Sequence, residues 1–183
     1  MGRVHESITP ALAEFIGAQK MFFVATAPSA GGHVNVSPKG HDTLRVLDDR
    51  RVAYLDLTGS GIETVAHLRD NARITVMWCA FEGPPRIVRV QGTGEVVPHD
   101  DQRFAELAAL FEPHRGARAV IVVTADRVAD SCGFSVPLMQ FVDERDQLDR
   151  WTDRKSDSEL AAYRSEKNSA SIDGLPALPP ADG

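Results

Sequence analysis

The chain has 183 residues, of which 43% are hydrophobic and 25% charged, a composition typical of one soluble globular domain with extensions. Lys and Arg number 20 against 26 Asp and Glu, and a net charge of −6 argues against the broad basic face of a nucleic-acid-binding protein. The longest apolar runs, 21–25 and 119–123, fall far short of the ~20 residues that a membrane-spanning helix requires. Cys79 and Cys132 have no paired spacing, and the first residues contain no apolar export signal, so we expect a cytoplasmic protein that binds neither nucleic acid nor membrane.

The predicted elements are mainly short strands separated by turns. Thr9 before Pro10 predicts a helix over 10–19, because a hydroxyl cap and a proline at the first helical position both favour a helix start. Two further helices are predicted at 63–70 and 98–111. Apolar runs and period-two alternation, bounded by turn residues, predict strands at 21–27, 33–38, 43–47, 51–57, 73–80, 86–97 and 118–127, the last of them fully buried.

This order of elements predicts a mainly β (α+β) fold with six or seven strands and short flanking helices. Hairpin turns join most neighbouring strands, so the sheet should be antiparallel. Closing such a sheet into a barrel removes its exposed edges, so a barrel is the expected architecture.

The composition changes after residue 130. Charged helices are expected at 146–155 and 158–168, and the proline-rich stretch 171–183 is expected to be an extended arm. We therefore predict a barrel domain over 1–130, with 131–183 forming a helical C-terminal extension and tail that pack on the same domain.

The segment 56–64, DLTGSGIET, lies where a predicted strand ends and a helix begins. Its glycines, hydroxyls and free helix amides are typical of an anion-binding loop. It lacks the lysine of a P-loop and, at Thr64, the third glycine of the dinucleotide fingerprint. The alternative is a plain turn in which Ser60 caps the helix.

Two cationic residues are candidates for binding an anion. Lys39 follows Ser37-Pro38 at a strand end, where it either meets a ligand or is a solvated turn residue. Arg86 shares a strand face with Val88 and should point inward, so it needs a carboxylate or a bound anion as partner. The six histidines have no metal-ligand spacing, and we expect no metal site.

Five segments follow one another between residues 21 and 97: FFVAT, HVNVSPKG, RVAYLDLTGSG, ETVAHLRDNARITVMW and GPPRIVRVQGTGEV. In this order they resemble the pyridoxamine 5'-phosphate oxidase-like family of FMN-binding split barrels. The resemblance implies that the barrel is a split β-barrel and that the protein is a homodimer with FMN at the subunit interface. The segments 131–137 and 171–176 look like those of an uncharacterised bacterial subgroup.

The resemblance also implies which residues bind the cofactor. Those expected along the flavin ring are Ser37, Pro38 and Lys39. Those expected at the ring and the phosphate are Asp56, Leu57, Thr58 and Gly59. Glu63 and Thr64 stand where pyridoxamine phosphate oxidases carry arginine and lysine. The phosphate would therefore be held by hydroxyls and backbone amides, with Lys39 or Arg86 supplying charge, or by residues of the C-terminal helices. No catalytic residue is identified.

The function implied is that of an FMN-binding flavoprotein, an oxidoreductase whose flavin carries the hydride for a small-molecule substrate. The oxidases of this family end in a Trp and Arg-Leu-Ala-Pro signature that binds the substrate phosphate, whereas this chain ends in Leu-Pro-Ala-Leu-Pro-Pro at 175–180. Together with Glu63 and Thr64, this argues against pyridoxamine phosphate as the substrate. Two alternatives remain open, a deazaflavin-dependent reductase and a flavin-binding carrier or sensor without turnover. A haem-handling barrel would need an axial ligand that the sequence does not identify.

Overall fold

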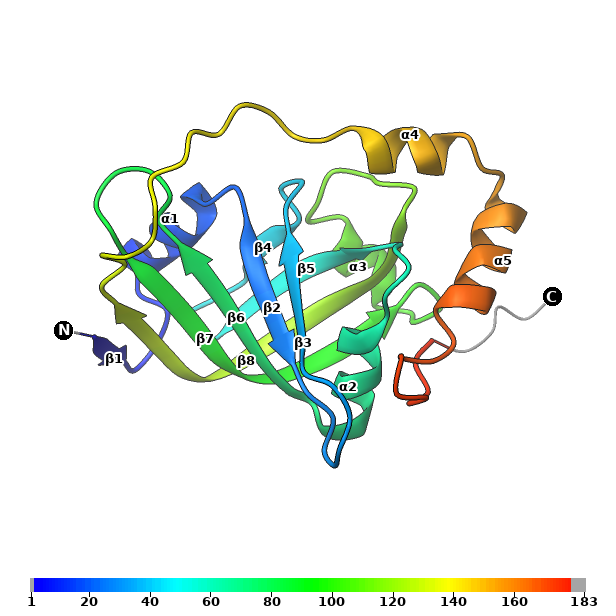
Figure 1. Ribbon diagram of the computed structural model, residues 1–183, viewed down its shortest axis with the longest axis horizontal. Coiled ribbons are helices and arrows are strands. Elements are labelled where there is room, and N and C mark those ends of the chain that lie inside the picture. The colour runs from blue at the N-terminus through cyan, green and yellow to red at the C-terminus, as the bar shows by residue number, and fades with distance from the viewer. Residues whose placement is uncertain (1, 179–183) are drawn as a thin grey trace.

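The computed structural model describes residues 2–178 and shows one antiparallel sheet curled into a half-barrel (Figure 1). Its strands are β1 (Arg3–His5), β2 (Phe22–Thr26), β3 (Asn35–Lys39), β4 (Leu44–Val46), β5 (Arg51–Leu57), β6 (Arg73–Cys79), β7 (Ile87–Pro98) and β8 (Ala117–Ser131). The helices are α1 (Pro10–Ala18), α2 (Glu63–Asn71), α3 (Phe104–Ala108), α4 (Gln147–Asp153) and α5 (Asp157–Lys167). The order across the sheet is β3-β2-β6-β7-β8-β5-β4, and β1 pairs with β8.

All pairings in this sheet are antiparallel, which confirms the predicted fold class. Within residues 2–178 no ladder joins the end strands β3 and β4, so the barrel is split rather than closed. A bulge at Gln91/Gly92 interrupts the long β7–β8 ladder. A Cβ atom at Gly92 would collide with the carbonyl oxygen of Thr124, so this close approach of two strands requires glycine.

Alternate side chains of the strands point into the half-barrel, where α1 and α2 complete the core. In β5, Val52 and Tyr54 belong to this inner cluster, whereas Ala53 and Leu55 pack outward in a second cluster with α3. The alternation places Asp56, two residues after Tyr54, on the inner side of the strand. The largest buried side chains of the inner cluster are Trp78, Tyr54, Leu12 and Ile16.

Two predicted elements differ from the structure in length. The helix expected over 98–111 is reduced to the five residues of α3, because β7 includes Pro98 and residues 99–103 form turns closed by the amides of Asp101 and Phe104. The strand expected over 118–127 extends over the 15 residues of β8. Beyond Val123 several of its side chains are exposed, so the expectation of a fully buried strand was wrong for its second half.

Both helices predicted in the C-terminal extension are present. A linker without regular structure leads from β8 along one end of the half-barrel to α4 and α5 (Figure 1). The two helices contact each other through Trp151 and Tyr163, whose ring centroids are 4.8 Å apart. Ser156 begins α5 with a capping box, the reciprocal pair of hydrogen bonds that satisfies first-turn amides.

The stretch predicted as an extended arm, 171–183, turns back on itself as far as residue 178. Ala170 forms a bridge with Pro176, and the turn between them includes Gly174 at a φ of 78°. Ala177 is buried in the inner core cluster. The extension is therefore packed on the barrel through this segment, and residues 179–183 lie outside the described part of the chain.

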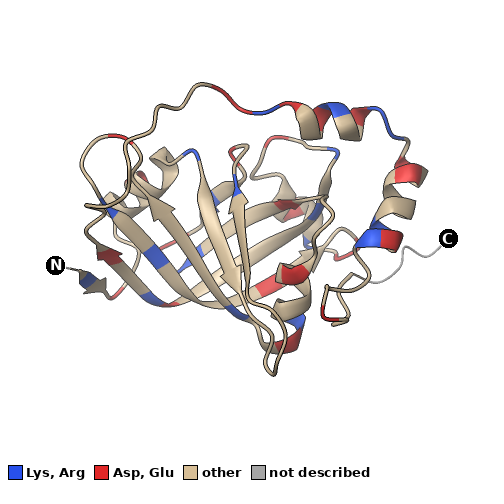
Figure 2. Cartoon of the chain, viewed as in Figure 1, with Lys and Arg blue, Asp and Glu red and all other residues tan. Residues whose placement is uncertain are grey.

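Charged residues of both signs are interspersed along the C-terminal helices, whereas the strands are mostly uncharged along their length (Figure 2). In the part of the chain that the structure describes, no helix is both long and apolar enough to cross a membrane. Within residues 2–178 no three His, Cys, Asp or Glu side chains gather in an arrangement that could hold a metal ion.

Candidate functional site

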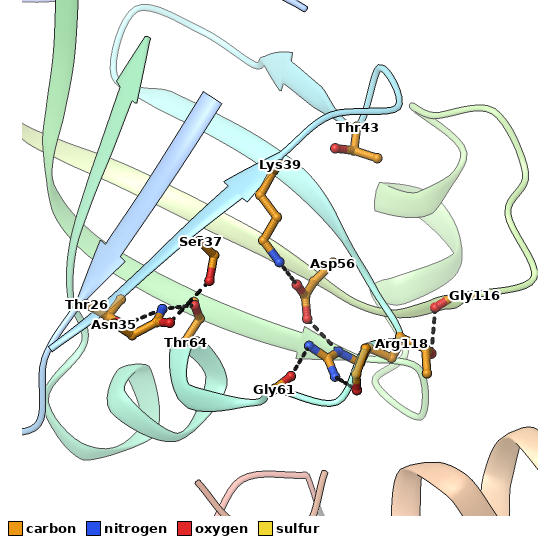
Figure 3. Close-up of polar contacts among 12 residues, drawn as sticks. Thr26, Asn35, Ser37, Lys39, Thr43, Asp56, Gly61, Thr64, Gly116 and Arg118 are labelled. Atoms are coloured by element: carbon orange, nitrogen blue, oxygen red, sulfur yellow. Dashed lines mark hydrogen bonds and ion pairs between the residues drawn. The ribbon is translucent and has the colours of Figure 1, made fainter. Parts of the chain in front are cut away.

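Asp56 lies at the centre of a buried ionic cluster inside the half-barrel. Its side chain is 1% exposed, and its two oxygens accept hydrogen bonds from different cations (Figure 3). Lys39 Nζ donates to Oδ1 at 2.8 Å, and Arg118 Nε donates to Oδ2 at 2.7 Å. Burial by itself raises the pKa of the Asp56 carboxyl, but Arg118 and Lys39 outweigh it and lower the pKa to about 2. The carboxylate is therefore charged at neutral pH, and two cations share its single negative charge.

Arg118 connects this cluster to the loop 58–62. Its side chain is 5% exposed, and its Nη2 donates to the carbonyl oxygen of Gly61 at 2.9 Å. Its Nη1 donates to Oδ1 of Asn168 at 2.8 Å. Arg118 is not among the site residues predicted from the sequence, although one signal pointed to it. A lone arginine next to the apolar run 119–123 cannot be buried without an anionic partner.

Thr58 is tied into the fold rather than free to bind a ligand. Its amide and its hydroxyl both donate to the carbonyl oxygen of Gly116, at 2.7 and 2.8 Å. The hydroxyl oxygen accepts from Arg164 Nε at 2.9 Å. The pKa of Arg164 is lowered by burial first and by the charge of Arg118 second. The hydroxyl proton of Thr58 is thus committed to the fold, contrary to the expectation that it donates to a phosphate.

The next residues of the loop are more open. Ser60 and Gly61 are exposed, and Ile62, not Ser60, is the N-cap of α2. The alternative interpretation of Ser60 as a helix cap was therefore wrong. No side chain caps this helix, so its first amides remain available.

A second polar network joins β3 to the first turn of α2. Asn35 Nδ2 donates to Thr64 Oγ1 at 3.1 Å, and Ser37 Oγ donates to Asn35 Oδ1 at 3.2 Å (Figure 3). Behind them, Thr26 Oγ1 lies 3.0 Å from Nδ1 of His67, which is fully buried. The network brings Ser37 and Thr64, two of the expected site residues, to the same side of the sheet.

A hollow of about 300 Å³ lies between the start of β3, the loop and the C-terminal tail. The tail is fixed there by Asp173, which accepts hydrogen bonds from the amide of His33 at 2.8 Å and contacts its Nδ1 at 2.7 Å. The amide of Ile172 donates to Glu63 at 3.3 Å, so a carboxylate already lies beside the start of α2. The hollow is lined by His33, Val34, Asn35, Ser60, Gly61, Glu63 and Ile172.

Three of the expected cofactor residues lie apart from the ionic cluster around Asp56. Arg86 is 33% exposed rather than turned into the interior, and its partner is the carboxylate of Asp130 at 2.7 Å. Of the two partners considered for it, the structure therefore shows the carboxylate. Leu57 packs outward against the cluster under α3, and Pro38 is exposed on β3. The structure does bring together Lys39, Asp56, Thr58 and Gly59. Thr58 bonds Arg164 of the extension, and Gly59 bonds Arg118 and Asn168.

Comparisons with known proteins agree with this architecture. The sequence profile described as "Pyridoxamine 5'-phosphate oxidase" matches residues 8–132. The Aspergillus flavus "Pyridoxamine 5'-phosphate oxidase family protein ustO" is 40% identical over an alignment of 191 positions, which covers 95% of this chain and 77% of that protein.

Two solved structures share the fold. A putative pyridoxamine 5'-phosphate oxidase from Lactobacillus delbrueckii superposes with a TM-score of 0.54 and 21% identity, over 68% of this chain and 94% of that one. HupZ from Group A Streptococcus superposes with a TM-score of 0.52 and 24% identity, over 66% of this chain and 91% of that one. With a split antiparallel barrel, a matching profile and a relative at 40% identity, the chain belongs to the pyridoxamine 5'-phosphate oxidase family.

Proposed function

We propose that the protein binds FMN, with the flavin phosphate at the loop 58–62, and acts as an oxidoreductase on a small molecule. The observation that carries the proposal is the buried cluster of Lys39, Asp56 and Arg118 beside that loop. Two cations against one carboxylate leave a net positive charge beside the loop, although Glu63 lines the hollow itself with a carboxylate. A phosphate would complete this charge balance.

The residues present fit such a ligand. Lys39 is 20% exposed, and only one of its three N–H groups is used by Asp56, so it can donate to a ligand oxygen. Asp56 fixes the position of that ammonium group. The exposed Ser60 and Gly61 add a hydroxyl and backbone amides on the wall of the hollow. A bound flavin would supply the hydride chemistry, which explains why no catalytic side chain needs to be present.

The proposed substrate is not pyridoxamine phosphate. Glu63 lines the hollow beside Gly61 and opposes any phosphate there, so FMN should be held less tightly than in the oxidases of pyridoxamine phosphate. The Arg-Leu-Ala-Pro signature with which the resemblance expects those oxidases to bind the substrate phosphate is replaced here by Leu-Pro-Ala-Leu-Pro-Pro at 175–180. We therefore favour a substrate without a phosphate.

We also propose that the protein is a homodimer. Val34 and Val36 are exposed at the edge strand β3 and its approach, and an apolar edge of this kind is a place where a second chain packs. Light scattering should give twice the mass of the chain. A monomer that still binds FMN at full occupancy would contradict this assembly.

The test is a flavin titration of the purified protein, followed by flavin fluorescence and the visible spectrum, with FMN and riboflavin in parallel. Lys39→Met should weaken FMN about ten- to a hundred-fold, the loss expected for one charge-assisted hydrogen bond, and riboflavin much less. Lys167→Met, at an exposed lysine of α5, is the matched control and should change neither affinity.

Three outcomes would change these hypotheses about Lys39, flavin binding and turnover. Equal losses of FMN and riboflavin would place Lys39 at the flavin ring instead of the phosphate. If the wild-type protein binds neither flavin, the proposal is wrong. Flavin that binds but is reduced by neither NADH nor NADPH nor reduced deazaflavin would indicate a carrier rather than an enzyme.

A further inference from the structure

The loop 58–62 is held from behind by Asn168, a residue of the C-terminal extension. Asn168 follows α5 and is fully buried. Its Oδ1 accepts from Arg118 at 2.8 Å, and its Nδ2 donates to the carbonyl oxygen of Gly59 at 2.9 Å. Both ends of one side-chain amide are therefore used, one by the ionic cluster and the other by the loop.

These contacts determine which way the peptide groups of the loop face. The carbonyl oxygen of Gly59 accepts from Asn168 at 2.9 Å and more weakly from Arg118 Nη1 at 3.4 Å, and that of Gly61 accepts from Arg118. In a trans peptide the N–H points opposite to the C=O, so the amides of Ser60 and Ile62 point away from Arg118 and Asn168. Within residues 2–178 neither amide has a protein acceptor. Because Ser60 and Gly61 line the hollow, the outward amide of Ser60 belongs to the wall that a ligand would contact, whereas that of Ile62 lies at the buried start of α2.

The glycines of the loop mean that its peptide groups need to be held by hydrogen bonds from other residues. Gly59 and Gly61 lack a Cβ atom, and glycine allows both orientations of a peptide plane at little cost. No side chain caps the N-terminus of α2, so no cap fixes the peptide groups that lead into this helix. The orientation of the two amides therefore depends on residues outside the loop, and the two that bond its carbonyl groups are Arg118 and Asn168.

We propose that Arg118 and Asn168 are positioning residues that orient the amide of Ser60 toward a bound phosphate. The C-terminal extension then controls how well the site discriminates a phosphorylated flavin from an unphosphorylated one. This inference rests on the proposed FMN site, but it assigns a role to residues that do not touch the ligand.

The experiment measures the dissociation constants of FMN and riboflavin for Asn168→Ala and Asn168→Asp. Asn168→Ala should weaken FMN about tenfold and riboflavin less than about twofold, so the ratio of the two constants changes. Asn168→Asp keeps the acceptor for Arg118 but loses the donor to Gly59, and it should show the same change of ratio. A merely structural role would weaken both ligands together.

The matched control is Asn71→Ala. Asn71 also ends a helix and also donates to a backbone carbonyl group, that of Ala27 at 2.9 Å, but it lies outside the loop. This variant should lower the melting temperature without changing the ratio of FMN to riboflavin affinity. A thermal melt of each variant shows whether it is folded.

Hydrogen exchange of the unliganded protein provides a second readout. Peptides that cover 57–62 should exchange faster in Asn168→Ala than in the wild type, while those from β6 should be unchanged. Unchanged exchange, or an unchanged ratio in a protein that binds both flavins, would overturn the inference and leave the proposed function standing. If the wild type binds neither flavin, the proposed function and this inference are both wrong.

Discussion

Two arginine–carboxylate pairs of the same length lie in different surroundings. Arg118 and Asp56 are 2.7 Å apart and nearly inaccessible, with exposed fractions of 5% and 1%. Arg86 and Asp130 are also 2.7 Å apart, but their exposed fractions are 33% and 18%. Distance alone therefore does not distinguish the two pairs. Burial does, because a charge that loses its partner in the interior has no water to replace it.

The largest expected effect is at the buried pair. Arg118→Met should lower the free energy of unfolding by about 3–5 kcal/mol, because it leaves Asp56 with Lys39 as its single cationic partner and leaves the carbonyl group of Gly61 without its donor. Urea unfolding followed by circular dichroism measures this. A loss below about 1 kcal/mol would mean that water reaches Asp56, and the distinction between the two pairs would disappear.

The second effect is a pH dependence of stability. The folded pKa of Asp56, about 2, lies below its value in the unfolded chain, near 4. The carboxylate therefore stabilises the fold fully above pH 4, and this contribution, about 2–3 kcal/mol, is lost as the pH falls from 4 to 2.

Unfolding free energies measured from pH 5 to pH 2 test this. Asp56→Asn should be less stable at pH 5 but should lose less stability toward pH 2 than the wild type. The pKa of Asp130 is also lowered, first by its hydrogen bond with Arg86, so Asp130→Asn is the matched comparison. We expect it to flatten the pH profile less, since Asp130 is partly hydrated. An equal or larger flattening would contradict the ranking.

The smallest effect is expected at the exposed pair. Arg86→Met should cost about 1 kcal/mol or less, because solvent screens the charge that remains on Asp130. The difference between Arg86→Met and the wild type should shrink further in 1 M salt, where the screening length falls to about 3 Å. Urea unfolding at low and high salt measures both quantities. A salt-independent loss would show that Arg86 acts through packing on Phe15, whose ring centroid lies 5.4 Å away.

The sequence predicted the parts of the site whose signal is local. The end of β3 with Lys39 and the glycine-rich loop after Asp56 both carry turn residues and polar groups in a short stretch, and both were identified. Arg118 and Asn168 were missed because their partners are 62 and 50 residues away, and no periodicity encodes such a pairing. The fold follows the same rule, because the hairpin signals that predicted the antiparallel sheet are local.

Long-range pairing and local turns together explain the helix that was predicted too long. Residues 98–111 have a helical pattern of their own, but Pro98 is in register with Ala119. The ladder with β8 therefore takes Pro98 out of the helix, and turns closed by the amides of Asp101 and Phe104 occupy the next residues. Tertiary pairing outweighed local helix propensity at Pro98, and turn formation outweighed it over 99–103.

The burial of Ala177 has a consequence for how the protein folds as it is made. Ala177 shares the inner cluster with Leu12 and Ile16 of α1, and β1 pairs with the far end of β8. The cluster therefore cannot be completed on the ribosome until residue 177 has left the exit tunnel. Until then the barrel end beside the tail keeps apolar surface exposed, and contacts between distant parts of a chain form slowly. Truncating the chain before Ala177 should accordingly lower the yield of folded protein in the cell more than its solution stability suggests.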